Sequence, residues 1–309
     1  MESQCIGLAQ ALGVTPMIKR IHLRKFWRDL SPYVTLGSRI AFSRKGDTIE
    51  PPWPDIVIAS GRQSILPALL IKKMSGGKTF LVQIQNPAIP TSNFDLVIVP
   101  EHDKLEGKNV ISMQGALHRV TPELLQSEAQ KWAPSFAHLP KPHVAVLLGG
   151  SNAVFKLDPR AVMKFGPQLA ALSKQQNLSL LVTPSRRTGE VNMVLLSALL
   201  HDCGHIIWDG EGDNPYYGML GSADAIIVTC DSINMVSEAC RTGKPVYVIP
   251  LQGHSDKFSS FHQHLLADGR IRMFDGTLDL NWPQHTPLDE MARVAELVRK
   301  AYSEQYRDQ

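Results

Sequence analysis

The chain has 309 residues, 43% of them hydrophobic and 20% charged. That length suits about two domains, and the composition excludes a disordered or low-complexity chain. The net charge of +3 and the 7% aromatic content exclude a dedicated nucleic-acid binder, which needs a denser basic surface and stacking platforms. A mildly basic protein of this kind suits an anionic ligand or a membrane surface.

The four cysteines, Cys5, Cys203, Cys230 and Cys240, form no CxxC pair and match no zinc spacing. Isolated thiols in a chain of this length are typical of a reduced, cytoplasmic protein. No apolar stretch approaches the roughly 18 residues of a membrane span, and the N-terminus lacks the pattern of a signal peptide. We therefore expect a cytoplasmic protein without a metal or other cofactor and with at most peripheral membrane contact.

Short apolar runs separated by helix-length segments dominate the chain. The runs cover residues 55–59, 79–84, 95–99, 109–112, 143–148, 178–183, 205–208, 224–229 and 245–249. Because they are apolar throughout rather than alternating, they predict parallel strands buried on both faces. The intervening segments with helical spacing are 63–74, 159–176, 189–201, 232–242, 256–268 and 288–302. Repeated strand–helix units predict an α/β protein built from doubly wound, Rossmann-like sheets.

A proline-rich segment, residues 131–142 (KWAPSFAHLPKP), precedes the strand predicted at 143–148. We place the domain boundary there, with an N-terminal domain at 1–135 and a C-terminal domain at 141–290. Two such domains of similar size are expected to face each other across a cleft. The sequence leaves open whether the last helix, within 291–309, crosses back onto the first domain.

The start of the chain departs from the usual pattern of such a domain. Residues 2–13 (ESQCIGLAQALG) already predict a helix that ends at Gly13. A doubly wound domain normally opens with a strand and a glycine-containing turn before that helix. We expect that strand to lie upstream, so that Met1 is an internal methionine; the alternative is a first domain built without it.

Two loops that follow predicted strands carry groups suited to an anion. Gly149, Gly150 and Ser151 follow the strand at 143–148, and Arg186 and Arg187 follow the strand at 178–183. Glycines allow a close backbone approach, and paired guanidiniums beside a helix N-terminus suit phosphate. The alternatives are an ordinary turn and a solvated charged loop. The absence of GxGxxG argues against a dinucleotide fingerprint.

A third loop and its helix add polar groups at the end of the strand at 224–229. Asp231 or Ser232 is expected to cap the helix that also carries Asn234, and Glu238 lies about two turns along it. A carboxylate at that place suits ribose hydroxyls. Asn214 stands in a loop that enters a short helix at the expected cleft. The alternative for these residues is a capping and surface role.

In the first domain, polar residues cluster where predicted strands end. Arg62, Gln83, Asn86 and Gln114 are candidates for the acceptor side of a site. Glu101, His102 and Asp103 follow the strand at 95–99, and the two carboxylates favour a charged imidazole between them. This trio is the candidate general base; the alternative is a hydrogen-bonded turn.

Several of these stretches together resemble a known family. GRQS, VQIQNP, FDLVIVPEHD, NVISMQGALHRVTPE, VLLGGSN, TPSRRTGE and NPYYGMLGSADAIIVTCDSINMVSEACRTGKPVYV run in order from about residue 55 to 250. They resemble the mitochondrial fission protein family that takes its name from the plant "elongated mitochondria" member, and which has many bacterial relatives. That family is similar to the two-domain GT-B glycosyltransferases. The segment ending EACRTGKPV and the GGS turn are similar to the nucleotide-sugar site of the muramyl-peptide N-acetylglucosaminyltransferase type.

The resemblance implies a role for each matching residue. Gly150 and Ser151 would lie near the donor diphosphate, Arg186 and Arg187 would balance its charge, and Ser232 with the following amides would hold phosphate. Glu238 would bind ribose.

The first hypothesis is therefore a glycosyltransferase that uses a nucleotide-diphosphate sugar and an unknown acceptor, a lipid-linked acceptor being one option. His102 or a neighbouring carboxylate would be the base. The second is a non-catalytic interaction protein. A third, a nucleotide-sugar epimerase, is disfavoured because the GxxGxxG turn and the YxxxK pair are missing.

Overall fold

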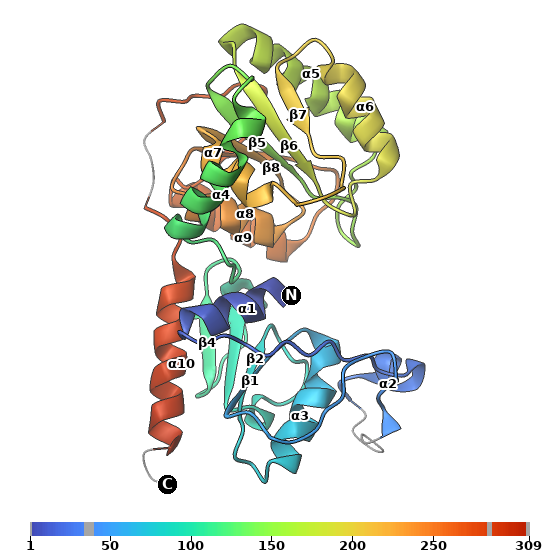
Figure 1. Cartoon of the computed structure of the whole chain (residues 1–309), viewed down its shortest axis with the longest axis vertical. Helices are drawn as coiled ribbons and strands as arrows, with labels where there is room; N and C mark the ends of the chain where they lie inside the picture. Colours follow the sequence, from blue (N-terminus) through green and yellow to red (C-terminus); the bar gives the residue numbers. More distant parts are fainter. Residues whose placement is uncertain (1, 34–39, 283–285, 307–309) are drawn as a thin grey trace. The chain divides into compact units, whose positions relative to one another are not determined.

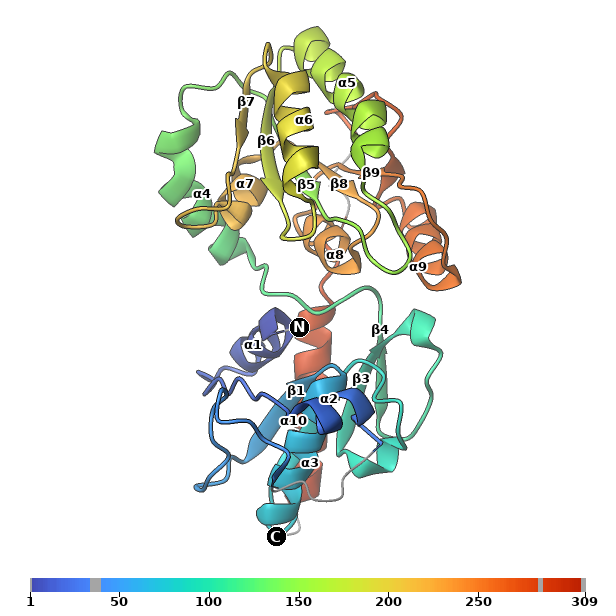
Figure 2. The same cartoon turned by 90° about the vertical axis from the view of Figure 1, so that its right-hand side faces the viewer.

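The computed structural model describes residues 2–33, 40–282 and 286–306. The chain divides into two compact units. Unit 1 comprises Met1–Arg119 together with Asp289–Gln309, and unit 2 comprises Val120–Leu288. Figure 1 and Figure 2 show the elements of each.

Unit 1 is built on a parallel sheet in the order β1-β2-β3-β4. The strands are β1 (Ile56–Ser60), β2 (Phe80–Ile84), β3 (Leu96–Pro100) and β4 (Val110–Met113). Every residue of β2 and β3 is buried, whereas β1 and β4, at the sheet edges, are partly exposed. This is the arrangement expected of apolar strands in a parallel sheet that is covered on both faces.

Helices cover both faces of the unit 1 sheet. On one face, α3 (Ile65–Met74) packs through Ile65 against Leu81 and Val97. On the other, α1 (Glu2–Ala11) and α10 (Glu290–Tyr306) pack against the alternate strand positions, with Leu8 and Val294 in the same cluster as Phe80. The short helix α2 (Lys25–Leu30) lies outside these layers (Figure 1). Single 3₁₀ turns occupy Arg62–Ser64, Thr91–Asn93 and Glu101–Asp103.

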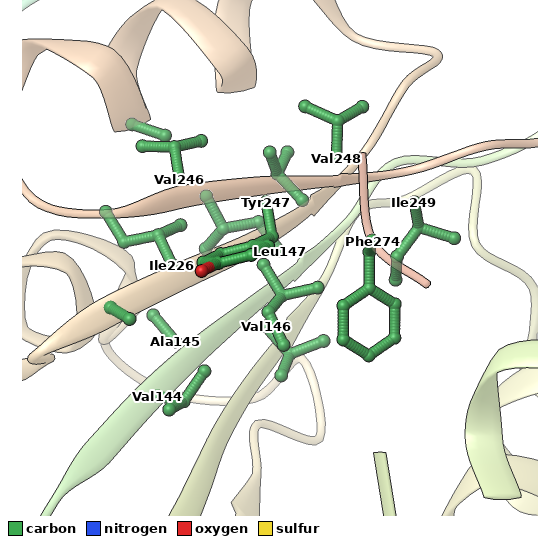
Figure 3. Close-up of a cluster of buried hydrophobic side chains, with 14 of the residues drawn as sticks. Val144, Ala145, Val146, Leu147, Ile226, Val246, Tyr247, Val248, Ile249 and Phe274 are labelled. Carbon is green, nitrogen blue, oxygen red and sulfur yellow. The ribbon is translucent and has the colours of Figure 1, made fainter. Parts of the chain in front are cut away.

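Unit 2 contains a parallel sheet in the order β10-β9-β8-β5-β6-β7. Its strands are β5 (His143–Leu148), β6 (Ser179–Pro184), β7 (His205–Ile207), β8 (Ala225–Thr229), β9 (Val246–Ile249) and β10 (Arg272–Met273). The chain runs from β5 to one side through β6 and β7, then returns to the other side of β5 at β8. This is the doubly wound order, and its switch point lies between β5 and β8. Figure 3 shows the core, in which Val146 of β5 lies among residues of β8, β9 and Phe274.

The helices of unit 2 are α4 (Pro122–Phe136), α5 (Pro159–Gln176), α6 (Glu190–Leu200), α7 (Tyr216–Ser222), α8 (Ile233–Arg241) and α9 (Asp256–Ala267). The start of α5 shows why the sequence was informative there. The carboxylate of Asp158 accepts a hydrogen bond from the amide of Ala161 at 3.0 Å, and Pro159 occupies the first turn. Both features favour a helix start at this position.

All nine expected strands are present, each within one residue of its expected ends, so the α/β, Rossmann-like fold is confirmed. The structure adds β10, α2 and α4, which the sequence did not predict. It also divides the chain between Arg119 and Val120, not at residues 131–142, because α4 packs on α7. That packing needs two glycines: a Cβ on Gly218 would lie 2.3 Å from the ring of Trp132, and one on Gly221 would lie 2.3 Å from the carbonyl of Leu125.

The last helix groups with unit 1, where α10 packs on α1. Within the described ranges, no helix combines the length and the apolar character that crossing a bilayer requires.

Candidate functional site

The candidate site in unit 2 lies where β5, β6 and β8 end. These three strands are neighbours in the sheet, with β5 in the middle. Their carboxyl ends therefore bring together the loops that begin at Gly149, Ser185 and Cys230. Open α/β sheets bind ligands at such a switch point.

Asp231 joins the three loops from a fully buried position. Its carboxylate accepts hydrogen bonds from the amide of Gly150 at 2.9 Å and from the hydroxyl of Thr229 at 2.7 Å. It also pairs with Nη2 of Arg187 at 3.1 Å, and its side chain has no exposed surface. Because a buried carboxylate is stable only when it is paired and hydrogen-bonded, these contacts hold the loops in one arrangement.

The Gly149–Gly150 turn is shaped by close approach to other parts of the protein. A Cβ on Gly149 would lie 2.2 Å from Oδ1 of Asp231, and a Cβ on Gly150 would lie 2.1 Å from the carbonyl oxygen of Arg187. The amide of Gly149 donates to Thr229 Oγ1 at 2.8 Å, and that of Gly150 donates to Asp231. These two amides are thus engaged within the protein, whereas the sequence suggested that they face a phosphate.

Ser151 and the loop after β6 are also tied to the Gly149–Gly150 turn. The hydroxyl of Ser151 donates to the carbonyl of Leu157 at 3.1 Å and accepts from its amide at 3.0 Å. The hydroxyls of Ser185 and Thr188 each donate to the carbonyl of Gly149 at 2.5 Å. The turn is therefore rigid on both sides.

The two neighbouring arginines have different surroundings. Arg187 donates to the carbonyl of Gly150 at 2.9 Å besides pairing with Asp231, so it serves the architecture of the loops. Arg186 is exposed. Its guanidinium is therefore the one of the pair that is available to an anion at the strand ends.

The start of α8 supplies a capped helix N-terminus. Ser232 has extended backbone angles, and its hydroxyl accepts a hydrogen bond from the amide of Met235 at 3.3 Å. Asn234 is exposed in the first turn of the helix. The capping role expected for Ser232 is thus present, and the other amides of that turn remain beside the switch point.

Glu238 is buried in the middle of α8 and is held by a residue that the sequence analysis did not single out. The hydroxyl of Tyr216, the first residue of α7, donates to Oε2 of Glu238 at 2.5 Å. Burial raises the pKa of Glu238 to about 7, although the bond from Tyr216 acts in the opposite direction. The same burial raises the pKa of Tyr216 well above its ordinary value. The aromatic pair in NPYYG was the available sequence signal for this contact.

Side-chain hydrogen bonds hold both ends of α7. Asn214 is exposed, and its side-chain oxygen accepts from the amide of Tyr216 at 2.9 Å. At the other end, Nζ of Lys244 donates to the carbonyls of Leu220 and Gly221, at 2.8 Å each. A lysine at a helix C-terminus satisfies carbonyls that have no partner within the helix. Burial lowers the pKa of this lysine to about 8.

In unit 1, Glu101, His102 and Asp103 form a 3₁₀ turn directly after β3. Nε2 of His102 lies 3.8 Å from Oδ1 of Asp103, beyond ordinary hydrogen-bond distance. The side chains of His102 and Asp103 are 5% and 12% exposed, whereas Glu101 is exposed. Glu101 is therefore the member of the trio that a substrate reaches without movement of the turn.

The four acceptor-side candidates have separate surroundings. Arg62 donates to the carbonyls of Ser31 and Asp29, so it anchors the end of α2. The side-chain oxygen of Asn86 accepts from the amide of Ala88 at 2.9 Å. The amide of Gln114 donates to Glu290 of α10 at 3.3 Å.

Gln83 does not lie at the strand end as expected. It is a fully buried residue of β2, and its Nε2 donates to the carbonyl of Ile84 at 2.9 Å. Because every position of β2 is covered by the helices on its two faces, this side chain belongs to the interior of unit 1.

The structure shows a polar group in unit 1 that sequence reasoning missed. The side-chain oxygen of Gln4, in α1, lies 3.3 Å from the hydroxyl of Ser60 and 3.5 Å from Nε2 of Gln85. Ser60 is the last residue of β1, and Gln85 directly follows β2.

The described residues contain no set of three His, Cys, Asp or Glu side chains placed to hold a metal ion.

Comparisons with known proteins identify the family. The family model described as "Mitochondrial fission ELM1" matches residues 1–302. The chain is 34% identical over 286 residues to the mitochondrial fission protein ELM1 of Arabidopsis thaliana, and this alignment covers 82% of the chain and 65% of that protein. It is 30% identical over 295 residues to the uncharacterized protein RP120 of Rickettsia prowazekii, with 82% of each chain covered.

A solved structure supports the fold at lower identity. The UDP-GlcNAc 2-epimerase of Neisseria meningitidis, determined bound to UDP-GlcNAc, superposes with a TM-score of 0.55 at 12% identity, covering 81% of this chain and 76% of that one. This likeness is one of fold: two Rossmann-like units of the GT-B type. The family is shown separately, by the family model over residues 1–302 and by the two relatives: the chain belongs to the mitochondrial fission ELM1 family.

Proposed function

We propose that unit 2 binds a nucleoside-diphosphate sugar at the ends of β5, β6 and β8. The observation that carries this proposal is the buried carboxylate of Glu238, which Tyr216 holds at 2.5 Å in the helix that follows the switch point. A buried ionisable group beside a ligand-binding edge is a candidate functional residue. Its Oε2 is engaged by Tyr216, and its other oxygen is assigned to the ribose hydroxyls.

The diphosphate would be neutralised by exposed Arg186 and by the first-turn amides of α8. A helix N-terminus and a guanidinium both favour negative charge, and they stabilise it more as the leaving diphosphate develops charge. Arg187 acts indirectly, because it fixes the Gly149–Gly150 turn and Asp231. Ser151, Asn214 and Asn234 are proposed as neighbours of the same ligand.

The proposed reaction is transfer of the sugar to an acceptor hydroxyl. The hydroxyl oxygen attacks the anomeric carbon, the bond from that carbon to the diphosphate oxygen breaks, and the nucleoside diphosphate leaves. The hydroxyl proton goes to a base, for which the Glu101–Asp103 turn is proposed, with exposed Glu101 as its most accessible member. Arg62, Asn86 and Gln114 remain proposed acceptor-side residues, and a lipid-linked acceptor is one option.

A second candidate is an interaction protein without turnover. Two observations favour it: the Gly149 and Gly150 amides are engaged within the protein, and the side chain of His102 is buried. The name of the Arabidopsis relative, a mitochondrial fission protein, points the same way. Since the chain spans only 65% of that relative's length, its activity and partners are proposals for this chain.

A thermal-shift panel of nucleoside diphosphates and their sugars tests binding, because a ligand of the folded state raises the melting temperature. We expect one nucleotide to give a selective shift that Arg186→Ala and Glu238→Ala abolish. Arg160→Ala, which removes an exposed arginine of α5 in the same unit, is the matched control. If no nucleotide shifts the melting temperature, or if both site variants bind as the wild type does, the nucleotide-sugar proposal fails.

Chromatography of the bound sugar nucleotide after incubation then separates the outcomes. Release of the nucleoside diphosphate with an acceptor present indicates transfer, and a changed sugar with the nucleotide still attached indicates epimerisation. Binding without either product supports the interaction protein. Glu101→Gln is expected to lower transfer while leaving the nucleotide shift intact.

A further inference from the structure

Exposed apolar side chains gather in one part of unit 1. Met17 is 84% exposed, Phe26 58%, Leu30 40% and Ile40 60%. Scattered exposed apolar residues are ordinary, whereas exposed apolar residues that adjoin one another in space mark an interaction surface. We call the described residues 14–33 and 40–47 the α2 face.

Backbone pairing holds the two parts of the α2 face together. Leu23 and Phe42 form an antiparallel bridge. On either side of it, the amide of Arg24 donates to the carbonyl of Ala41, and the amide of Ser43 donates to the carbonyl of His22, at 2.8 Å each. Ile40, Arg44 and Lys45 are therefore brought beside the start of α2. Residues 14–33 and 40–47 therefore form one surface, although they are not continuous in the sequence.

The inner side of the α2 face is already packed. Leu23, Ala41 and Leu66 of α3 form a buried cluster, and Trp27 packs against it. Phe26 and Leu30 are four residues apart in α2, so they lie on one side of the helix. Both are exposed, and α2 stands outside the layers of unit 1 (Figure 1).

The α2 face is also strongly basic. It contains seven lysines and arginines, and its acidic residues are Asp29 and Asp47. The excess positive charge therefore lies in this short part of a chain whose total net charge is +3. Arg20 pairs with Glu2 at 2.8 Å, and Arg28 pairs with Asp29 at 3.1 Å. The other basic residues of the α2 face are exposed: Lys19, Arg24, Lys25, Arg44 and Lys45.

We propose that the α2 face docks on an anionic lipid bilayer, with Phe26, Leu30 and Ile40 entering the interface and the surrounding lysines and arginines contacting lipid phosphates. Apolar side chains interleaved with lysine and arginine are the pattern of an interfacial membrane contact. Each basic residue near an anionic surface adds attraction, and long basic side chains keep their charge at the headgroups while their stems lie along apolar surface. A nucleic acid would leave the exposed aliphatic groups without a partner. The inference stands independently of the proposed nucleotide site.

Vesicle co-sedimentation of the full chain, without nucleotide, tests this proposal. We expect binding to vesicles that contain phosphatidylglycerol, little binding to pure phosphatidylcholine, and weaker binding at high salt. The triple variant Lys19→Gln, Lys25→Gln and Lys45→Gln should weaken partitioning by about a hundredfold, taking roughly fivefold for each basic residue. The double variant Phe26→Ser and Leu30→Ser should lower partitioning onto anionic vesicles at both low and high salt.

Matched variants in unit 2 control for loss of charge and of apolar surface. Arg160→Gln with Lys164→Gln removes exposed basic residues of α5, and Val191→Ser with Val194→Ser removes exposed apolar residues of α6. Both should partition as the wild type does. Circular dichroism confirms that each variant is folded. The proposal is overturned if the wild type does not bind anionic vesicles, if it binds neutral ones equally, or if the control variants lose binding as strongly as the α2-face variants.

Discussion

The hydroxyl of Tyr216 donates a 2.5 Å hydrogen bond to Oε2 of Glu238 and so joins the first turn of α7 to the middle of α8. Lys244 holds the opposite end of α7 through two carbonyls. A seven-residue helix is thus fixed at both ends by the segment 238–244. The electrostatics and the stability of unit 2 are linked at this contact.

Glu238 makes the stability of the protein depend on pH. Its pKa is about 7 in the folded protein against an ordinary 4.5. Between these two pH values, Glu238 is therefore still protonated in the folded state but has lost its proton in the unfolded state. Its contribution to the free energy of unfolding is largest below about pH 4.5 and falls by about 3 kcal/mol as the pH rises through 7. Glu238→Gln should therefore be more stable than the wild type at pH 8 and similar to it at pH 5. Urea unfolding at the two pH values measures this, with exposed Glu190→Gln as control; the same pH profile in wild type and Glu238→Gln would contradict it.

Asp231 and its partner Arg187 should respond differently to truncation. Asp231→Ala leaves the amide of Gly150 and the hydroxyl of Thr229 without their acceptor in a buried place, so we expect a loss of about 3 kcal/mol. Arg187→Ala leaves the buried carboxylate of Asp231 without its cation, but Asp231 keeps two other donors and Arg187 is 45% exposed, so a smaller loss of about 2 kcal/mol is expected. Arg186→Ala should change the free energy of unfolding by less than about 0.5 kcal/mol. Chemical denaturation gives the three values, and an equal loss for the two arginines would refute the separate roles.

Gly150 should tolerate no side chain. A Cβ there would lie 2.1 Å from a backbone oxygen, and relief requires the loop after β6 to move. Gly150→Ala is expected to cost about 3 kcal/mol. Gly212→Ala is the control: its φ of +66° strains an alanine, but the space around it is open, so about 1 kcal/mol is expected. Comparable melting temperatures for the two variants would show that the close approach is not maintained in solution.

The boundary between the units can be tested with fragments. Residues 120–288 include α4, whose Trp132 and Leu125 cover Gly218 and Gly221 of α7. We expect this fragment to fold with a cooperative transition. A fragment of residues 141–288 follows the boundary expected from the sequence but lacks α4, and should melt at a lower temperature and bind a hydrophobic dye. Equal stability of the two fragments would mean that α4 contributes nothing to unit 2.

The strands and several helices could be predicted because their sequences allow few alternatives. A run such as HVAVLL, apolar on both sides and followed by Gly149-Gly150, has one stable place, the middle of a covered parallel sheet. The Asp158–Pro159 pair defined the start of α5. In contrast, the end of α4 contains Pro134 and lies in the proline-rich stretch 131–142, so the sequence pattern there indicated a linker. Its place depends on contacts with α7, which is about 80 residues further along the chain.

The sequence alone determined the α/β class, the family and the loops that carry polar groups, because periodicity, caps and contiguous motifs are local properties. Tertiary structure decided which of those groups meet. The sheet order places β5 between β6 and β8, and only this order brings Arg187 and Gly150 to Asp231. The same packing buries Glu238 beside Tyr216 and encloses Gln83 within unit 1. Burial and charge pairing depend on neighbours distant in the chain, and these settle whether a polar residue supports the fold or remains available to a ligand.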